Sequence, residues 1–212
     1  MKTDYYVLTH ELDEKKVGQD FSQIGYIQPN PQNLSSWEFP NKSLKFTFEL
    51  NDKAIKTDFL KTSAVSANGF FISEKVKTIL EKFKLMDHKY YPAVLKTKNN
   101  TNQYYWLHLC DLKIVNHIDY EKSAFHRTKF NAKKEGIQIN SFNHYEELKK
   151  QNGFSFGARV EKIALLNSFP NFDIFTFLPF DNQVYISTSL KDSLIEKNIT
   201  GFNVKKNSKF II

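Results

Sequence analysis

The 212-residue sequence has a single cysteine, only seven glycines and no long apolar run, and each scarcity excludes a class of structure or chemistry. Cys110 alone cannot form an internal disulfide and is compatible with a reducing compartment. The glycines form neither GxGxxG nor GxxxxGK, so a phosphate-binding loop has no support. Residues 1–8 contain no signal-peptide core, and no run approaches the length of a membrane span. We therefore expect a cytoplasmic protein without a membrane partner.

Arginine is also scarce, although the chain is basic, with a formal charge of +7 and a pI near 9.2. Its positive charge is almost all lysine, and the only arginines are Arg127 and Arg159. Bidentate recognition of phosphate and guanine favours arginine, and no block of five basic residues occurs. A solvated lysine-rich surface is therefore the simpler explanation, and nucleic-acid binding is the less favoured alternative.

The hydrophobic content of 41% and aromatic content of 15% predict a globular protein. One local sequence pattern occurs twice in the chain. Residues 69–82 and 183–197 each contain an apolar run that ends in Ile-Ser, with a leucine seven residues after the serine. The pattern predicts a short strand followed by a helix whose N-caps are Ser73 and Ser187. It specifies architecture and no chemistry.

Strand patterns predominate elsewhere, and residues 44–50 alternate apolar and polar positions without a fault. Residues 91–95 and 103–109 predict a hairpin, and residues 113–118 would continue the sheet. Amphipathic spacing at 158–166 predicts a helix. We expect an α+β fold of antiparallel or mixed sheets with a few short helices.

The basic stretch 126–136 lacks apolar periodicity, ends in glycine and is the best candidate for a boundary. The chain is therefore expected to form either one domain, residues 1–212, or two lobes, residues 1–128 and 129–212, each with one strand-Ile-Ser-helix unit. Pro29, Asn30, Pro31 and Asn33 predict a long irregular connection in the first of these.

Candidate catalytic and metal-binding residues gather between positions 108 and 126, but their spacing is not specific. His108 and Cys110 share a strand face, as do His117 and Asp119, so four metal ligands could converge. However, neither CxxC nor HExxH occurs. Cys110 could also be a thiol nucleophile, but a lone cysteine in an aromatic strand is more often a core residue. We expect no enzyme, no catalytic residue, no metal and no cofactor.

Three aromatic residues are candidate contacts for a protein partner. Trp37 follows the irregular connection and either packs on the core as a lid or contacts a partner. Tyr104 and Trp106 share one strand face and Tyr105 lies on the opposite one, so the core claims some of these rings.

Seven short motifs follow one another in a characteristic order: TDFL at 57–60, FISEK at 71–75, YWL at 105–107, Ile118-Asp119 with Ser123, DIF at 173–175, VYIS at 184–187 and TGF at 200–202. This order resembles the immunity protein 11 family of bacteria and its relatives, such as immunity protein 43. The resemblance spans roughly residues 57–204, whereas the Pro/Asn-rich segment at 29–33 is unmatched and is a candidate region for partner specificity.

Members of the family are typically encoded beside polymorphic toxins. The resemblance implies a small cytoplasmic protein that binds a toxin domain and neutralises it by direct contact, and it supplies no catalytic residues. A chain with a net charge of +7 suits a partner that is not strongly basic, because complementary charge steers the encounter of two proteins. The alternative is a lysine-rich nucleic-acid-binding or regulatory module, which salt-sensitive binding to arbitrary DNA or RNA would reveal.

Overall fold

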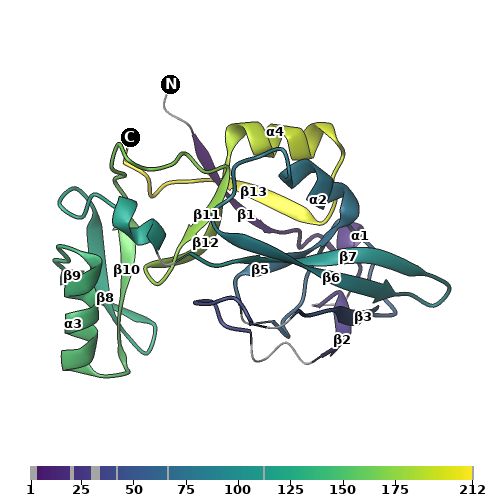
Figure 1. The fold of residues 1–212 in the computed structure, drawn as a ribbon, viewed down its shortest axis with the longest axis horizontal. Helices are drawn as coiled ribbons and strands as arrows, with labels where there is room; N and C mark the ends of the chain where they lie inside the picture. The colour runs from purple at the N-terminus through teal and green to yellow at the C-terminus, as the bar shows by residue number, and fades with distance from the viewer. Residues whose placement is uncertain are drawn as a thin grey trace.

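The computed structural model describes residues 4–19, 22–29, 34–41, 43–65, 67–111 and 113–211 and has an α+β fold. Its strands form three sheets, antiparallel or mixed, and the helices are few and short, as predicted (Figure 1). Within these ranges no helix is long and apolar enough to cross a membrane. Residues 30–33, which hold most of the predicted irregular connection, lie outside the described residues.

The largest sheet has six strands, and only its β3–β6 pair is parallel. In spatial order it contains β2 (Ile24–Gln28), β3 (Phe46–Leu50), β6 (His88–Lys96), β7 (Thr101–Leu109), β5 (Gly69–Ser73) and β4 (Phe59–Leu60). The alternation at 44–50 is confirmed, because Phe46 and Phe48 are fully buried. The predicted hairpin is also confirmed, as β6 and β7 pair along their whole length.

The second sheet joins strands from both ends of the described chain. Its order is β11 (Ile174–Phe177), β12 (Asp181–Ser187), β1 (Tyr5–His10) and β13 (Phe202–Lys206), and all three pairs are antiparallel. β1 therefore lies between two strands that follow it by more than 170 residues. The short helix α1 (Glu14–Val17) comes directly after it.

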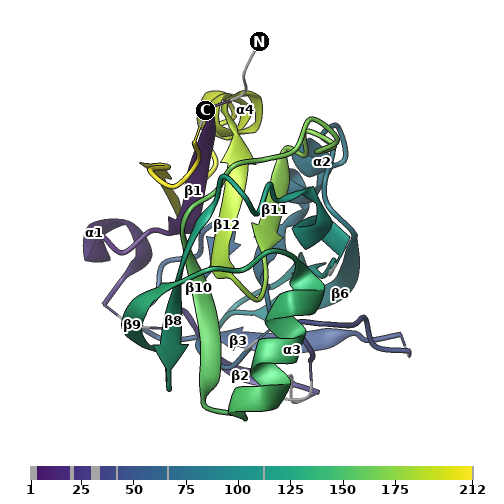
Figure 2. The same cartoon turned by 90° about the vertical axis from the view of Figure 1, so that its left-hand side faces the viewer.

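The third sheet contains β10 (Phe156–Lys162), β8 (Ala124–Lys129) and β9 (Ala132–Ile137), and helix α3 (Phe142–Asn152) covers it (Figure 2). We call residues 124–162 the small lobe. The predicted boundary at 126–136 is wrong, because this stretch is the β8–β9 hairpin. Phe130 and Asn131 form its turn with φ of 49° and 64°, as tight hairpins require.

Two further predictions fail because short apolar patterns fit more than one structure. The predicted helix at 158–166 is mostly β10, where Phe156, Ala158 and Val160 are buried at the alternate positions of a strand. The predicted strand at 113–118 is a 3₁₀ helix, η2 (Lys113–His117), which buries Ile114 and Val115. In both segments the neighbouring elements that cover the apolar side chains determine which of these structures forms.

The division into lobes at residue 128 is also wrong. It would cut β8 and separate β1 from both of its partners. One cluster of buried residues includes Tyr5 of β1, Ile72 of β5 and Val160 of β10, so a single hydrophobic core extends through all three sheets. A second cluster, with Phe48, Leu95 and Trp106, packs on the six-stranded sheet.

The repeated sequence pattern forms the same local structure twice, as predicted. β5 leads into α2 (Glu74–Leu80), and β12 leads into α4 (Thr188–Glu196). The Ser73 hydroxyl accepts a hydrogen bond from the backbone N–H of Val76 at 3.3 Å, and Ser187 accepts one from Leu190 at 3.2 Å. Both serines are therefore N-caps.

In the first unit, Asp58 joins this cap to a distant part of the chain. The Ser73 hydroxyl donates to Oδ1 of Asp58 at 2.8 Å, and Oδ2 accepts from the backbone N–H of Thr200, four residues after α4. Gly201 follows with φ of 84°, and a Cβ there would lie 2.1 Å from the carbonyl oxygen of Phe59. Only glycine allows the chain after α4 to approach β4 this closely.

In the second unit, Asp173 makes the reciprocal contacts. Ser187 donates to its Oδ1 at 2.6 Å, and its Oδ2 accepts from the backbone N–H of Lys84 at 2.9 Å. Lys84 lies four residues after α2, as Thr200 does after α4. Each aspartate thus fixes its own helix start to the chain that leaves the other helix, and the two units interlock.

The likeness of the two units extends to a neighbouring strand. β7 pairs with β5, and β1 occupies the corresponding place beside β12. Lys77 of α2 lies 5.2 Å from the ring centre of Tyr105 on β7, and Lys191 of α4 lies 4.2 Å from that of Tyr6 on β1. The neighbouring strand of the second unit is therefore β1, the first strand of the described chain.

We predict that Ser187→Ala lowers the free energy of unfolding by about 1 to 2 kcal/mol, because α4 loses its cap and Asp173 loses a donor. Ser193→Ala, in the same helix, is the control and should change it by less than about 0.5 kcal/mol. Urea unfolding followed by circular dichroism measures both values. Equal stability of the two variants would contradict the role of the cap.

His10 ends β1 in a largely buried position, with its ring against that of Phe70. Burial lowers its pKa to about 4, and the charge of Lys61 adds to the effect. In the unfolded chain this histidine therefore takes up a proton near pH 6.5, whereas in the folded chain it does so only near pH 4. A depressed histidine pKa means that stability is lost as the pH falls through this window.

We predict that acidification from pH 6.5 to pH 4 costs the protein up to about 3 kcal/mol through this residue. His10→Gln cannot take up the proton and should lose correspondingly less stability over the same range. Urea unfolding at both pH values gives the comparison, in which the contribution of the carboxylates cancels. The same acid loss in both proteins would show that His10 does not cause it.

Candidate functional site

Tyr104 and Trp106 lie in the interior, so their predicted role as partner contacts is wrong. Only 4% and 2% of their surfaces are exposed. The Tyr104 hydroxyl donates to the carbonyl oxygen of Thr57 at 2.7 Å, and the Trp106 ring packs 4.9 Å from that of Phe71. The face of β7 that carries them is covered by the second core cluster.

Trp37 is 44% exposed, and its role as a partner contact stays a prediction. Its backbone N–H donates to the Ser35 hydroxyl at 3.0 Å. The carbonyl oxygen of Ser35 lies 2.9 Å from Nε2 of His108, so this segment is attached to β7.

The candidate thiol nucleophile lies in an unsuitable environment. Cys110 is buried, and burial raises its pKa to about 11, with the carboxylate of Asp111 adding to the effect. A reactive cysteine requires the opposite shift, because the thiolate is the nucleophile.

The four proposed metal ligands do not converge. Nδ1 of His117 faces the Ser168 hydroxyl at 3.3 Å, and Asp119 forms an ion pair with Lys122, whereas His108 and Cys110 are buried elsewhere. In the part of the chain that the structure describes, no group of three or more His, Cys, Asp and Glu residues could hold a metal ion.

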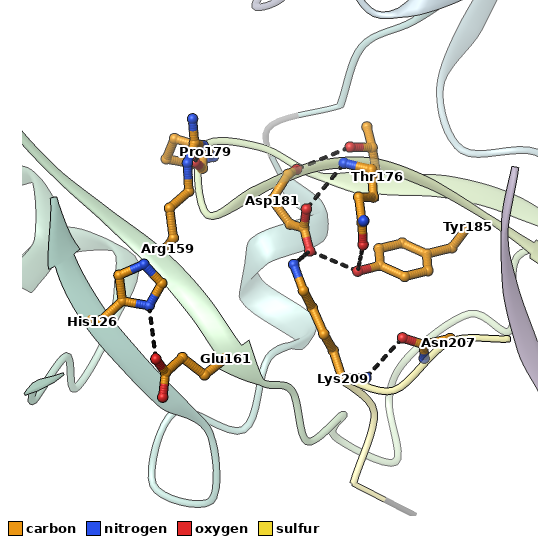
Figure 3. Close-up of polar contacts among 10 residues, drawn as sticks. His126, Arg159, Glu161, Thr176, Pro179, Asp181, Tyr185, Asn207 and Lys209 are labelled. Carbon is orange, nitrogen blue, oxygen red and sulfur yellow. Dashed lines mark hydrogen bonds and ion pairs between the residues drawn. The ribbon is translucent and has the colours of Figure 1, made fainter. Parts of the chain in front are cut away.

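A polar network joins the four-stranded sheet to the C-terminal segment beside the small lobe (Figure 3). Asp181, at the start of β12, is 3% exposed. Its carboxylate accepts from the Tyr185 hydroxyl at 2.6 Å, from Nζ of Lys209 at 2.5 Å and from the backbone N–H of Gln183 at 3.0 Å. The buried charge is paired and fully hydrogen-bonded, as burial requires.

The small lobe faces this network across an open hollow of about 550 Å³. Nδ1 of His126 lies 3.2 Å from Oε1 of Glu161, and Arg159 donates to the carbonyl oxygen of Pro179 at 2.5 Å (Figure 3). Lys133 also forms an ion pair with Glu161. Each carboxylate of the hollow therefore has a cationic partner. This arrangement fits a structural link between the sheets better than a site for a ligand.

Two of the most exposed large apolar side chains of the described residues are a pair of phenylalanines at one end of the small lobe. Phe130, in the β8–β9 turn, is 66% exposed, and Phe154, between α3 and β10, is 91% exposed. Their ring centres lie 5.7 Å apart with the planes at 62°. Figure 2 shows that this end, where β8 ends and β10 begins, lies opposite the end that carries α4.

Three lysines lie close in sequence to the two phenylalanines. Lys129 precedes Phe130, and Lys149 and Lys150 lie in the last turn of α3, just before Phe154. All three are exposed, and none forms an ion pair within the described residues. We call these five residues the apex: Lys129, Phe130, Lys149, Lys150 and Phe154.

The apex is the best candidate functional site, and the sequence prediction missed it. Two signals could have found it: a phenylalanine in the turn of a lysine-rich hairpin, and another directly after the helix-ending Gly153. Both positions normally carry polar residues, because turns lie at the surface. An exposed aromatic pair there indicates an interaction surface.

Comparison of the sequence with models of known protein families gives no match, and comparison with curated proteins gives none either. The motifs that carry the resemblance to immunity proteins serve the scaffold: Asp58, Ser73, Asp173 and Ser187 form the interlocking contacts, and Gly201 allows the close approach.

We predict that Cys110 does not react with a thiol reagent such as Ellman's reagent in the folded protein, because it is buried and its pKa is raised. Reaction should begin only with global unfolding in urea, at the midpoint seen by circular dichroism. Rapid labelling under native conditions would revive the thiol-nucleophile reading.

Proposed function

We propose that this chain is an immunity protein that binds a bacterial toxin domain and neutralises it by direct contact, without catalysis. The resemblance in motif order supports this proposal. Several of the matching residues form the interlocking contacts between the two strand-helix units, so the surface outside them is free to determine the partner.

The observation that carries the proposal is the exposed pair Phe130 and Phe154. Two large aromatic rings in water are costly, and here they contact each other at the end of the small lobe, beyond the buried core. Large aromatic side chains are frequent anchors of protein interfaces. Blocking a toxin by occupying its surface needs a contact surface of this kind and no reactive group.

Nucleic-acid binding is the second candidate, and one observation favours it. Unpaired lysines beside exposed aromatic rings also occur in proteins that bind single strands through phosphate contacts and base stacking. In that case affinity for arbitrary RNA or DNA would fall steeply as salt rises.

If a toxin is encoded next to this chain, we predict that co-expression with its C-terminal domain restores cell survival and yields a stable complex on purification. The reason is that neutralisation by contact requires the two proteins to remain bound. An inactive toxin variant serves as the control for co-purification without selection for survival. Rescue without a complex, or toxicity without rescue, would contradict the proposal.

A further inference from the structure

We infer that the apex is the surface that contacts the toxin domain, and that it docks into an apolar pocket rimmed by aspartate and glutamate on that domain. This inference rests on the proposed function and adds to it the interface and the chemistry of the partner.

The two rings are suited to fill an apolar pocket. A buried phenylalanine removes some 150 to 250 Å² from water. The rings already contact each other, and the backbone N–H of Phe130 donates to the carbonyl oxygen of Ser155 at 3.1 Å, which ties the two loops together. Docking therefore orders few additional side chains, and a preorganised anchor binds more tightly.

The charges near the rings indicate which kind of residue lines the rim of that pocket on the partner. Lys129, Lys149 and Lys150 are exposed and unpaired, as described above. The small lobe contains eight of the thirty basic residues and only four of the twenty-three acidic ones. Three unpaired lysines on the segments that carry the exposed rings are complementary to carboxylates beside an apolar pocket. A basic counterpart would be repelled.

The same residues favour a protein partner over nucleic acid. Both arginines of the small lobe have partners: Arg127 pairs with Glu135 at 2.7 Å, and Arg159 donates to the carbonyl oxygen of Pro179, outside the lobe. No arginine fork is therefore free for phosphate. The rings stand at 62° to each other, so they do not present one flat stacking platform for consecutive bases.

A second copy of the chain is also a poor occupant. Contact between two apices would bring two sets of three unpaired lysines together, and like charges at an interface weaken association. The surface therefore fits a different, acidic protein. Next to the apex, β9 is the exposed edge strand of the small sheet and extends the available surface.

Two pairs of matched variants test the inference. Phe130→Ser with Phe154→Ser removes the anchor, and Leu12→Ser with Ile195→Ser removes two exposed apolar side chains elsewhere. Lys129→Glu, Lys149→Glu and Lys150→Glu reverse the rim. Lys82→Glu, Lys205→Glu and Lys206→Glu give the same net charge away from the small lobe. Circular dichroism and thermal unfolding establish that each variant is folded.

We predict the following kinetics with an immobilised, inactive toxin domain. Loss of both phenylalanines raises Kd about 100-fold or more, mainly through faster dissociation. Reversal of the three apex lysines slows association about 10-fold or more at low salt and removes its salt dependence. The two control variants should stay within about threefold of the unmodified chain, because their changes lie outside the interface.

The outcomes separate this inference from the proposed function. If the unmodified chain and both apex variants bind the toxin domain equally well, the apex is not the interface, although immunity by contact stands. If the unmodified chain does not bind the domain, both fail. Binding to a single-stranded RNA that the apex lysine variant abolishes, or self-association that the phenylalanine variant abolishes, would also overturn the inference.

Discussion

The fold depends on two aspartates that each bind a helix cap and a distant backbone N–H. Asp58 and Asp173 hold the starts of α2 and α4, and each also holds the chain that leaves the other helix. Hydrogen bonds to a carboxylate are stronger than those between neutral groups. Neither unit can loosen without releasing a contact of the other, and the helices, the two larger sheets and the core between them keep one arrangement.

The contacts between neighbours in the chain can be predicted from the sequence, and the contacts between distant residues cannot. Ser73 and Ser187 are predictable because a cap and the apolar spacing behind it involve neighbours in the chain. The place of β1 beside β12 follows from contacts between residues more than 170 positions apart. Patterns in the chain carry no information about such pairing, and for that reason the division at residue 128 fails.

The candidate site shows the same limit. Alternation along β7 indicates that Tyr104 and Trp106 share a face, but which face is buried depends on the loop and strands that cover it. Phe130 and Phe154 stand out once the hairpin and the end of α3 are known, because only then do two loops distant in sequence bring the rings together. A surface site depends on which residues the fold brings together, and sequence periodicity does not report this.

The position of β1 has a consequence for how the protein is made. A ribosome releases β1 long before β12 and β13, the two strands that flank it in the sheet. Until the last of these emerges, the first strand has unsatisfied edges and apolar side chains, while the small lobe, formed from contiguous sequence, has all of its strands. Nascent chains therefore contain all the strands of the small lobe before they can complete the four-stranded sheet, and the unpaired β1 is where chaperones would be needed.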